Sequence, residues 1–227
     1  RDEGYNAVIG NYWWLAYRPD KLINQMLRRC ARSGYPIPFF AAPESHNTPR
    51  AAARPGGLKY ARLVWALGCL MPALPFCHAG FEIAEVVPVN TGLDFEREDL
   101  SAYPAEKLPL FSEAAYSWES EEDLLQWIQR VLDIRVQYAD LITDSDPTTF
   151  GLVASDNPNV WAVVRHQARR AISILFNLTW EVDVSFRIRL PTDKAEIVDL
   201  LSQRTFALNR SQLEATFEPA ECVIATW

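Results

Sequence analysis

The sequence predicts an α/β fold in two parts, on two observations. In the first part, short apolar runs alternate with segments whose apolar residues recur every three or four positions. That alternation is the pattern of parallel strands joined by helices. Beyond a polar turn at residues 143–147 the period becomes two, without interruption over residues 181–190. We therefore expect an α/β domain over residues 1–146, followed by a small antiparallel β-sandwich over residues 147–227 with one solvated face.

Three strand–helix pairs are expected in the first part. The predicted strands are residues 5–9, 37–42 and 74–77, and the predicted helices are residues 21–32, 58–70 and 120–138. Gly34 ends the first helix and Pro72 ends the second. Ser120 can cap the third helix, whose first turn is acidic. An irregular insertion is expected over residues 86–117.

Antiparallel strands are expected throughout the second part. They are predicted at residues 160–164, 171–178, 181–190, 213–217 and 222–227.

The composition excludes several classes of partner and cofactor. The net charge is -7 and no block of Lys and Arg is present, so we expect no nucleic-acid partner. The longest apolar stretch, Leu63–Phe76, is too short and interrupted to cross a membrane. Four cysteines without CxxC or cysteine–histidine spacing predict neither a metal site nor a disulfide framework. No cofactor is expected, and the cysteine usage favours a reduced, cytoplasmic setting. The chain begins at Arg1 on a charged turn, which we take to indicate a piece of a longer protein.

Two predicted strands end in dense polar clusters. The strand at residues 37–42 leads into Glu44, Ser45, His46 and Asn47, and the strand at residues 74–77 leads into a second group containing His and Glu. Neighbouring strands of a β/α barrel have this property, because the carboxyl ends of the strands build the active site. The expected fold of residues 1–146 is therefore a partial (β/α)8 TIM barrel, comprising its last three strands and helices.

The order of these motifs resembles the C-terminal half of the α-amylase clan, glycoside hydrolase family 13. Residues 45–48, Ser-His-Asn-Thr, resemble the motif on the seventh barrel strand, and residues 74–85 resemble the segment on the eighth. Residues 4–8 resemble the sixth strand, and residues 149–227 resemble the clan's C-terminal sandwich. Residues 88–95 further resemble the maltosyltransferase branches.

The resemblance implies an activity on α-1,4-glucosidic bonds. Such enzymes are hydrolases or transglycosidases that use two carboxylates in the retaining mechanism, with α-glucan or maltodextrin as substrate. In the clan those carboxylates come from the fourth and fifth strands, which this chain does not carry. The resemblance therefore implies that the chain alone is inactive, and that its partner is the N-terminal remainder of the barrel.

Asn47 departs from the clan's pattern at a catalytic position. The resemblance places there a third carboxylate, which holds sugar hydroxyls and stabilises the positive charge of the transition state. Asn has the same shape as Asp but is uncharged and brings an amide donor. Losing one preorganised electrostatic group typically costs about a hundred- to a thousand-fold in rate. Asn47 is also open to a purely structural interpretation, as a turn or helix-capping residue.

The substrate-binding candidates are His46, Glu44, Arg50, Trp13 and Glu82. Arg50 is equally open to a role as a solvated charge or as the ionic partner of Glu82, and Trp13 to packing under its loop. Two alternatives to an enzyme remain open. One is a non-catalytic relative that binds α-glucan or only supports structure, which Asn47 favours. The other is an unrelated β/α protein with coincidental polar strand ends.

Overall fold

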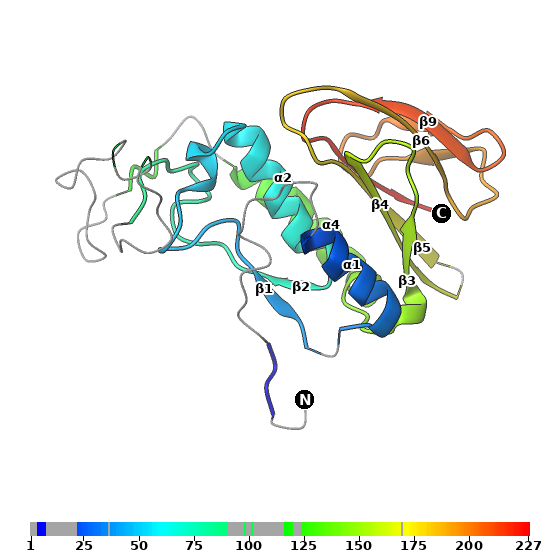
Figure 1. The fold of residues 1–227 in the computed structure, drawn as a ribbon, viewed down its shortest axis with the longest axis horizontal. Coiled ribbons are helices and arrows are strands. Elements are labelled where there is room, and N and C mark those ends of the chain that lie inside the picture. The colour runs from blue at the N-terminus through cyan, green and yellow to red at the C-terminus, as the bar shows by residue number, and fades with distance from the viewer. Residues whose placement is uncertain are drawn as a thin grey trace.

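The computed structural model of the chain describes residues 4–7, 22–35, 37–89, 98, 101, 116–119, 124–168 and 170–227. Its first part contains helices and one small parallel sheet, and its second part consists of antiparallel sheets. Helices α1, α2 and α4 form a layer between the β1–β2 pair and the four-stranded sheet (Figure 1). The chain is therefore an α/β protein in which strands predominate in the second part.

A strand–helix–strand unit forms the centre of the first part. β1 (Phe39–Ala41) pairs in parallel with β2 (Ala73–Pro75), and α2 (Gly57–Leu70) connects them. The predicted parallel arrangement of these two strands is confirmed. Nearly every residue of α2 from Tyr60 onward is buried, as its all-round apolar sequence predicts. Gly68 allows this close packing, because a Cβ atom there would lie 3.1 Å from Cβ of Ala41 on β1.

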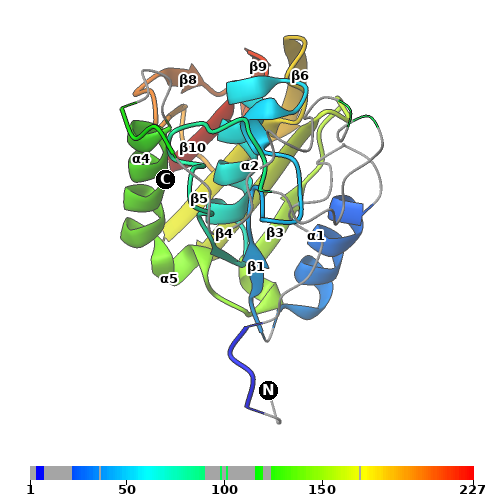
Figure 2. The same cartoon turned by 90° about the vertical axis from the view of Figure 1, so that its left-hand side faces the viewer.

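Two further helices flank α2, as Figure 2 shows. α1 (Leu22–Ser33) ends before Gly34, which has a φ of 65° and makes the capping bond from its N–H to the carbonyl of Cys30. α4 (Leu125–Gln137) buries Val131 and Ile134 and is followed by the short α5 (Ala139–Ile142). Arg135 of α4 donates to the carbonyls of Cys69 and Ala73, which fixes α4 against the end of α2.

The second part is built from three antiparallel sheets. The largest has the strand order β10-β5-β4-β3, and the pairs β6–β9 and β7–β8 complete the sandwich. The strands are β3 (Phe150–Val153), β4 (Val160–Gln167), β5 (Arg170–Asn177), β6 (Val184–Arg189), β7 (Glu196–Val198), β8 (Thr205–Ala207), β9 (Gln212–Phe217) and β10 (Cys222–Thr226).

The large sheet differs from the prediction of one solvated face. β6 alternates buried and exposed residues as expected, but β4 and β5 are buried almost throughout. Trp161 and Ile174 on one face belong to the core formed with α2, whereas Ala162 and Leu175 on the other belong to the core of the sandwich. The sheet is thus covered on both sides, because the helical layer occupies the face that was expected to meet water.

Other boundaries also differ from the sequence prediction. The described residues 4–7 contain no strand, and the rest of the strand predicted at residues 5–9 lies outside the described residues. α4 begins at Leu125 with Leu124 as its N-cap, later than the predicted start; Ser120 lies outside the described residues. Strands β3, β7 and β8 were missed, since strands of three or four residues carry little periodicity.

The two parts share one core across the predicted boundary at residues 146 and 147. Trp180, between β5 and β6, packs its ring edge-on against Tyr60 of α2, with ring centroids 5.3 Å apart. Gly56, immediately before α2, lies beneath the same indole at a φ of 97°. The division into domains at residues 1–146 and 147–227 stays a prediction, and the packing shows that the two segments stabilise each other.

Replacing Gly56 should test this contact. A Cβ atom at position 56 would lie 2.5 Å from Cγ of Trp180, and a left-handed φ is itself unfavourable for alanine. We expect Gly56→Ala to lower the free energy of unfolding by about 2–4 kcal/mol, measured by urea denaturation. Gly151→Ala is the control, because its Cβ would meet nothing closer than 3.6 Å and should change stability by less than about 1 kcal/mol. Equal effects of the two substitutions would contradict the assigned contact.

Candidate functional site

The polar residues predicted at the two strand ends do meet in space. Because β1 and β2 are parallel and in register, the segments that follow them leave the sheet at the same edge. The imidazole of His46, after β1, lies 6.4 Å from that of His78, after β2, measured between ring centroids. We call Glu44, His46, Asn47, Arg50 and His78 the strand-end cluster.

Two members of the cluster, Glu44 and Arg50, form a buried ion pair. The Arg50 guanidinium donates to Oε1 of Glu44 at 2.6 Å, and the backbone N–H of Ala51 donates to Oε2 at 2.6 Å. Both side chains are only 1% exposed. Arg50 therefore is not a solvated charge, and the interpretation that pairs it with Glu82 is wrong, since its carboxylate partner is Glu44.

Arg50 also joins loops from three parts of the chain. It donates to the carbonyls of Val87 at 3.1 Å and Ala79 at 2.9 Å, and to the Tyr116 hydroxyl at 3.0 Å. Val87 and Ala79 follow β2, and Tyr116 lies beyond the residues 102–115 that the structure leaves undescribed. Most N–H donors of the guanidinium thus find acceptors, and these acceptors belong to the chain segments around the cluster.

Burial and charge act in opposite directions on this pair. Burial raises the pKa of the Glu44 carboxyl, and the Arg50 guanidinium and the Ala51 N–H oppose that rise. Burial by itself would lower the pKa of Arg50, but the Glu44 carboxylate and the Tyr116 hydroxyl together outweigh burial, and the pKa is raised. A guanidinium paired in this way stays charged, and neither residue presents polar atoms to solvent.

His78 is held neutral beside the ion pair. Its Nδ1 lies 2.9 Å from the Arg50 guanidinium, which can only donate, so Nδ1 accepts and the ring proton is on Nε2. Burial, together with Arg50 and His46, lowers the pKa of His78 to about 4. The cluster therefore combines a buried cation with a neutral imidazole that keeps one donor.

Asn47 lies in a tight turn on the rim of the cluster. The Thr48 hydroxyl accepts from the N–H of Ser45, and the N–H of Asn47 donates to the Ser45 hydroxyl at 3.2 Å. The Asn47 side chain is half-buried, and its Oδ1 is a buried acceptor with no hydrogen-bond partner among the described residues. A buried acceptor without a donor is costly, so the described residues leave the hydrogen-bonding capacity of this oxygen unused.

The remaining predicted residues are Glu82, whose charge acts on His78 and opposes the lowering of its pKa, and Trp13. Glu82 is half-buried, and its Oε2 lies 3.8 Å from the Cys77 thiol. Trp13 lies outside the described residues. Sequence reasoning missed Tyr116 and the exposed Trp118, whose rings are 5.6 Å apart, because no strand or motif marks that segment.

The described residues contain no group of three or more His, Cys, Asp and Glu side chains placed to hold a metal ion. In the same part of the chain, no helix has the length and apolar character needed to cross a membrane.

Comparison with solved structures identifies the architecture. An α-amylase from Anoxybacillus, reported as a new glycosyl hydrolase subclass, superposes with a TM-score of 0.71 over 99% of this chain at 14% identity. This chain shares its fold with α-amylases. An α-amylase from Geobacillus thermoleovorans complexed with acarbose gives 0.66 over 92% at 13% identity. A maltogenic α-amylase from Thermotoga neapolitana gives 0.69 over 100% at 12% identity.

The match covers only part of each neighbour. This chain spans 48%, 44% and 52% of those three structures, respectively, and therefore about half of their length. No family model and no curated protein matches the sequence. At these identities the likeness concerns the fold, so activity and substrate have to be argued from the site.

The neutral state of His78 makes stability depend on pH. Unfolded histidine titrates near pH 6.5, above the value of about 4 in the folded chain, so the unfolded state binds the proton first as the pH falls. The stability should therefore decrease from about pH 6.5 towards pH 4. Between pH 7 and pH 5 we expect a loss of about 1–2 kcal/mol that His78→Gln abolishes, measured by urea denaturation. The exposed His166 provides the control His166→Gln, which should keep the pH dependence. The same dependence in His78→Gln would contradict the assignment.

Proposed function

We propose that this chain is the C-terminal part of an α-glucan-active glycoside hydrolase or transglycosidase of the α-amylase type. The observation that carries the proposal is the meeting of His46, Asn47 and His78 where β1 and β2 end, within a chain that shares its fold with α-amylases. Neighbours of this chain have been solved with maltose and with maltotriose, which supports an α-glucan as the ligand class.

In this proposal, β1, α2 and β2 are the end of a (β/α)8 barrel whose other strands lie in a preceding segment. Among the described residues, the sheet formed by β1 and β2 has no third strand. The face of this pair opposite α2 carries Phe40, Leu74 and Phe76. Leu74 is 40% exposed and Phe76 is 46% exposed. A barrel packs side chains of this kind in its interior, so the open face fits the missing remainder.

The members of the cluster then divide by accessibility. Glu44 and Arg50 are buried and satisfied by partners, so they support the site rather than contact the sugar. Burial and the Arg50 guanidinium keep His78 neutral. His46 is exposed and would contact a sugar hydroxyl, and the half-buried Asn47 would contact another through its side-chain amide. Contacts of the substrate with Glu82 at the rim and with Trp13 are part of the same proposal.

Catalysis in this proposal follows the retaining route, with both reacting carboxylates supplied by the preceding segment. This chain alone would then be inactive, and Asn47 would weaken even the assembled site, since an amide adds no negative charge beside the developing cation. A maltosyl-transferring specificity and a cytoplasmic location remain predictions of the sequence. The second candidate, a non-catalytic α-glucan-binding relative, is favoured by the amide at position 47.

Complementation tests the catalytic proposal. The chain is co-expressed with the polypeptide encoded directly upstream, and maltodextrin turnover is measured for the natural chain and for Asn47→Asp. We expect Asn47→Asp to raise turnover about a hundred- to a thousand-fold, because it restores the charge beside the transition state. Asn209→Asp, the same change in the β-domain, is the control and should leave turnover unchanged.

No increase with both upstream carboxylates present would reject the role of Asn47. If the upstream segment lacks such a pair of carboxylates while the assembled protein still binds maltodextrin, the protein is a non-catalytic α-glucan-binding relative and the enzymatic proposal is rejected.

The open face of β1 and β2 predicts self-association of the chain when its partner is absent. Sedimentation equilibrium of the 227-residue chain should give a weight-average mass that rises with concentration above 25.8 kDa. Phe76→Ser should reduce this association, because it removes an exposed aromatic ring from the face. Val136→Ser, at a 75% exposed position on α4, is the control and should have little effect. A monodisperse monomer with a cooperative melt would count against the partial barrel.

A further inference from the structure

An exposed tryptophan lies beside the strand-end cluster. Trp118 is 59% exposed, and its ring packs edge-on against that of Tyr116, with the two ring centroids 5.6 Å apart. A tryptophan ring carries a large apolar surface, so leaving it in water forgoes the stabilisation that burial would give. Trp118 belongs to neither hydrophobic core of the described residues, and its exposure therefore serves no packing role within them.

Tyr116 holds this ring next to the cluster. The Tyr116 hydroxyl accepts from Nη2 of Arg50 at 3.0 Å, and the guanidinium carbon lies 5.5 Å from the centre of the Tyr116 ring. Nη1 of the same guanidinium lies 2.9 Å from Nδ1 of His78. Tyr116 and His78 are therefore neighbours around one buried planar group, and Trp118 lies one aromatic ring further out.

The loop after β2 leaves room for this aromatic pair. Gly80 has a φ of 94°, and a Cβ atom there would lie 3.1 Å from Cε1 of Tyr116 and 3.3 Å from Nη2 of Arg50. The Tyr116 ring is thus held by the shape of the loop as well as by its hydroxyl. Because Trp118 packs against a ring that is itself held in place, it loses less conformational entropy when a ligand covers it.

We propose that Trp118 is a specificity-determining residue that stacks on a glucose unit of an α-glucan chain extending from the strand-end cluster. This inference rests on the function proposed above and adds to it a preference for longer chains. A glucose ring has hydroxyls at its edge and C–H groups on its faces, so an aromatic ring can cover a face while the hydroxyls keep their partners. The exposed Ser117 and Glu119 flank Trp118 in the chain and carry acceptors of the kind that such hydroxyls require.

Ligands of two lengths test this assignment on the chain co-expressed with the polypeptide encoded directly upstream. The ligands are maltose and maltopentaose with sulfur in place of the linking oxygen, which resist cleavage, and calorimetry gives their dissociation constants. Trp118→Ala should weaken binding of the thio-linked maltopentaose about tenfold and binding of the thio-linked maltose less than about threefold. Trp118→Phe keeps a flat ring and should stay within about threefold of the natural chain for both ligands. Equal weakening of both ligands by Trp118→Ala, or no weakening of maltopentaose, would overturn the proposal.

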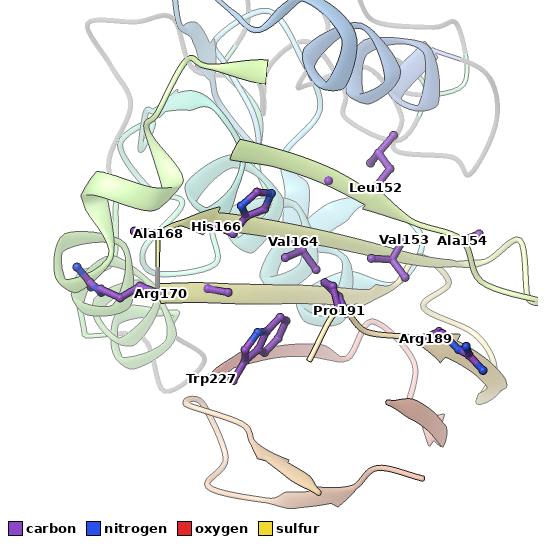
Figure 3. A pocket seen from close by; sticks show the side chains of 12 residues that line it. Leu152, Val153, Ala154, Val164, His166, Ala168, Arg170, Arg189, Pro191 and Trp227 are labelled. Carbon is purple, nitrogen blue, oxygen red and sulfur yellow. The ribbon is translucent and has the colours of Figure 1, made fainter. Parts of the chain in front are cut away.

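Trp227 provides the matched control, because it is another partly accessible tryptophan. It lines a groove of about 730 Å³ in the β-sandwich together with Val164 and Pro191 (Figure 3), and none of the described lining residues belongs to the strand-end cluster. Trp227→Ala should leave the affinity for thio-linked maltopentaose unchanged, with the melting temperature as a folding control. A loss of affinity in folded Trp227→Ala equal to that in Trp118→Ala would reject the assignment to Trp118.

Chemical oxidation tests the same contact without a substitution. N-bromosuccinimide oxidises accessible indole rings, and mass spectrometry of peptides locates the product. In the assembled protein, thio-linked maltopentaose should protect Trp118 from oxidation and leave the reaction of Trp227 unchanged. If Trp118 resists oxidation before any ligand is added, the upstream polypeptide covers it and the proposal fails.

The outcomes separate this inference from the function on which it rests. An assembled protein that neither binds the thio-linked ligands nor turns over maltodextrin would reject the α-glucan function itself, and the Trp118 subsite with it. An assembled protein that binds maltopentaose while the oxidation of Trp118 is unaltered would reject the subsite alone.

Discussion

The buried guanidinium of Arg50 holds together the loops that follow β1 and β2, and the strand-end cluster depends on it. Its charge is compensated by Glu44, and its other donors are used by carbonyls and by Tyr116. Removing one partner of such a buried pair is costly, typically about 3–5 kcal/mol, because the other charge is left unpaired. Burial, reinforced by the same guanidinium, keeps His78 neutral. Arg50 therefore contributes both to the position of the loops and to the protonation state at the cluster.

The helical layer gives this arrangement its rigidity. α2 is buried between the β1–β2 pair and the large sheet, and Gly56 and Gly68 allow the close approaches at its start and near its end. The large sheet is apolar on both faces because it meets the helices on one side and the sandwich on the other. The face of β1 and β2 opposite α2 remains open, with exposed Leu74 and Phe76. That contrast is the physical ground for proposing a further segment that completes the sheet.

The sequence predicted those elements whose periodicity is long. Apolar residues that recur every three or four positions correctly located α1 and α2. Apolar residues that recur every two positions correctly located β4, β5, β6, β9 and β10. The short strands β3, β7 and β8 escaped, and α4 begins later than expected. At the site, the sequence located His46 and Asn47 at a strand end, and the parallel register brings them beside His78. It assigned Arg50 to the substrate or to solvent, since burial and long-range partners leave no local signal.

The sequence by itself determined the α/β class, the change to antiparallel strands, and the presence of an amide at position 47 among polar strand ends. These properties follow from local periodicity and residue identity. Only the tertiary structure decided which carboxylate Arg50 pairs with, and that Oδ1 of Asn47 lacks a partner among the described residues. Those properties depend on contacts between residues that are distant along the chain, and such contacts exist only once the sheets and helices have packed.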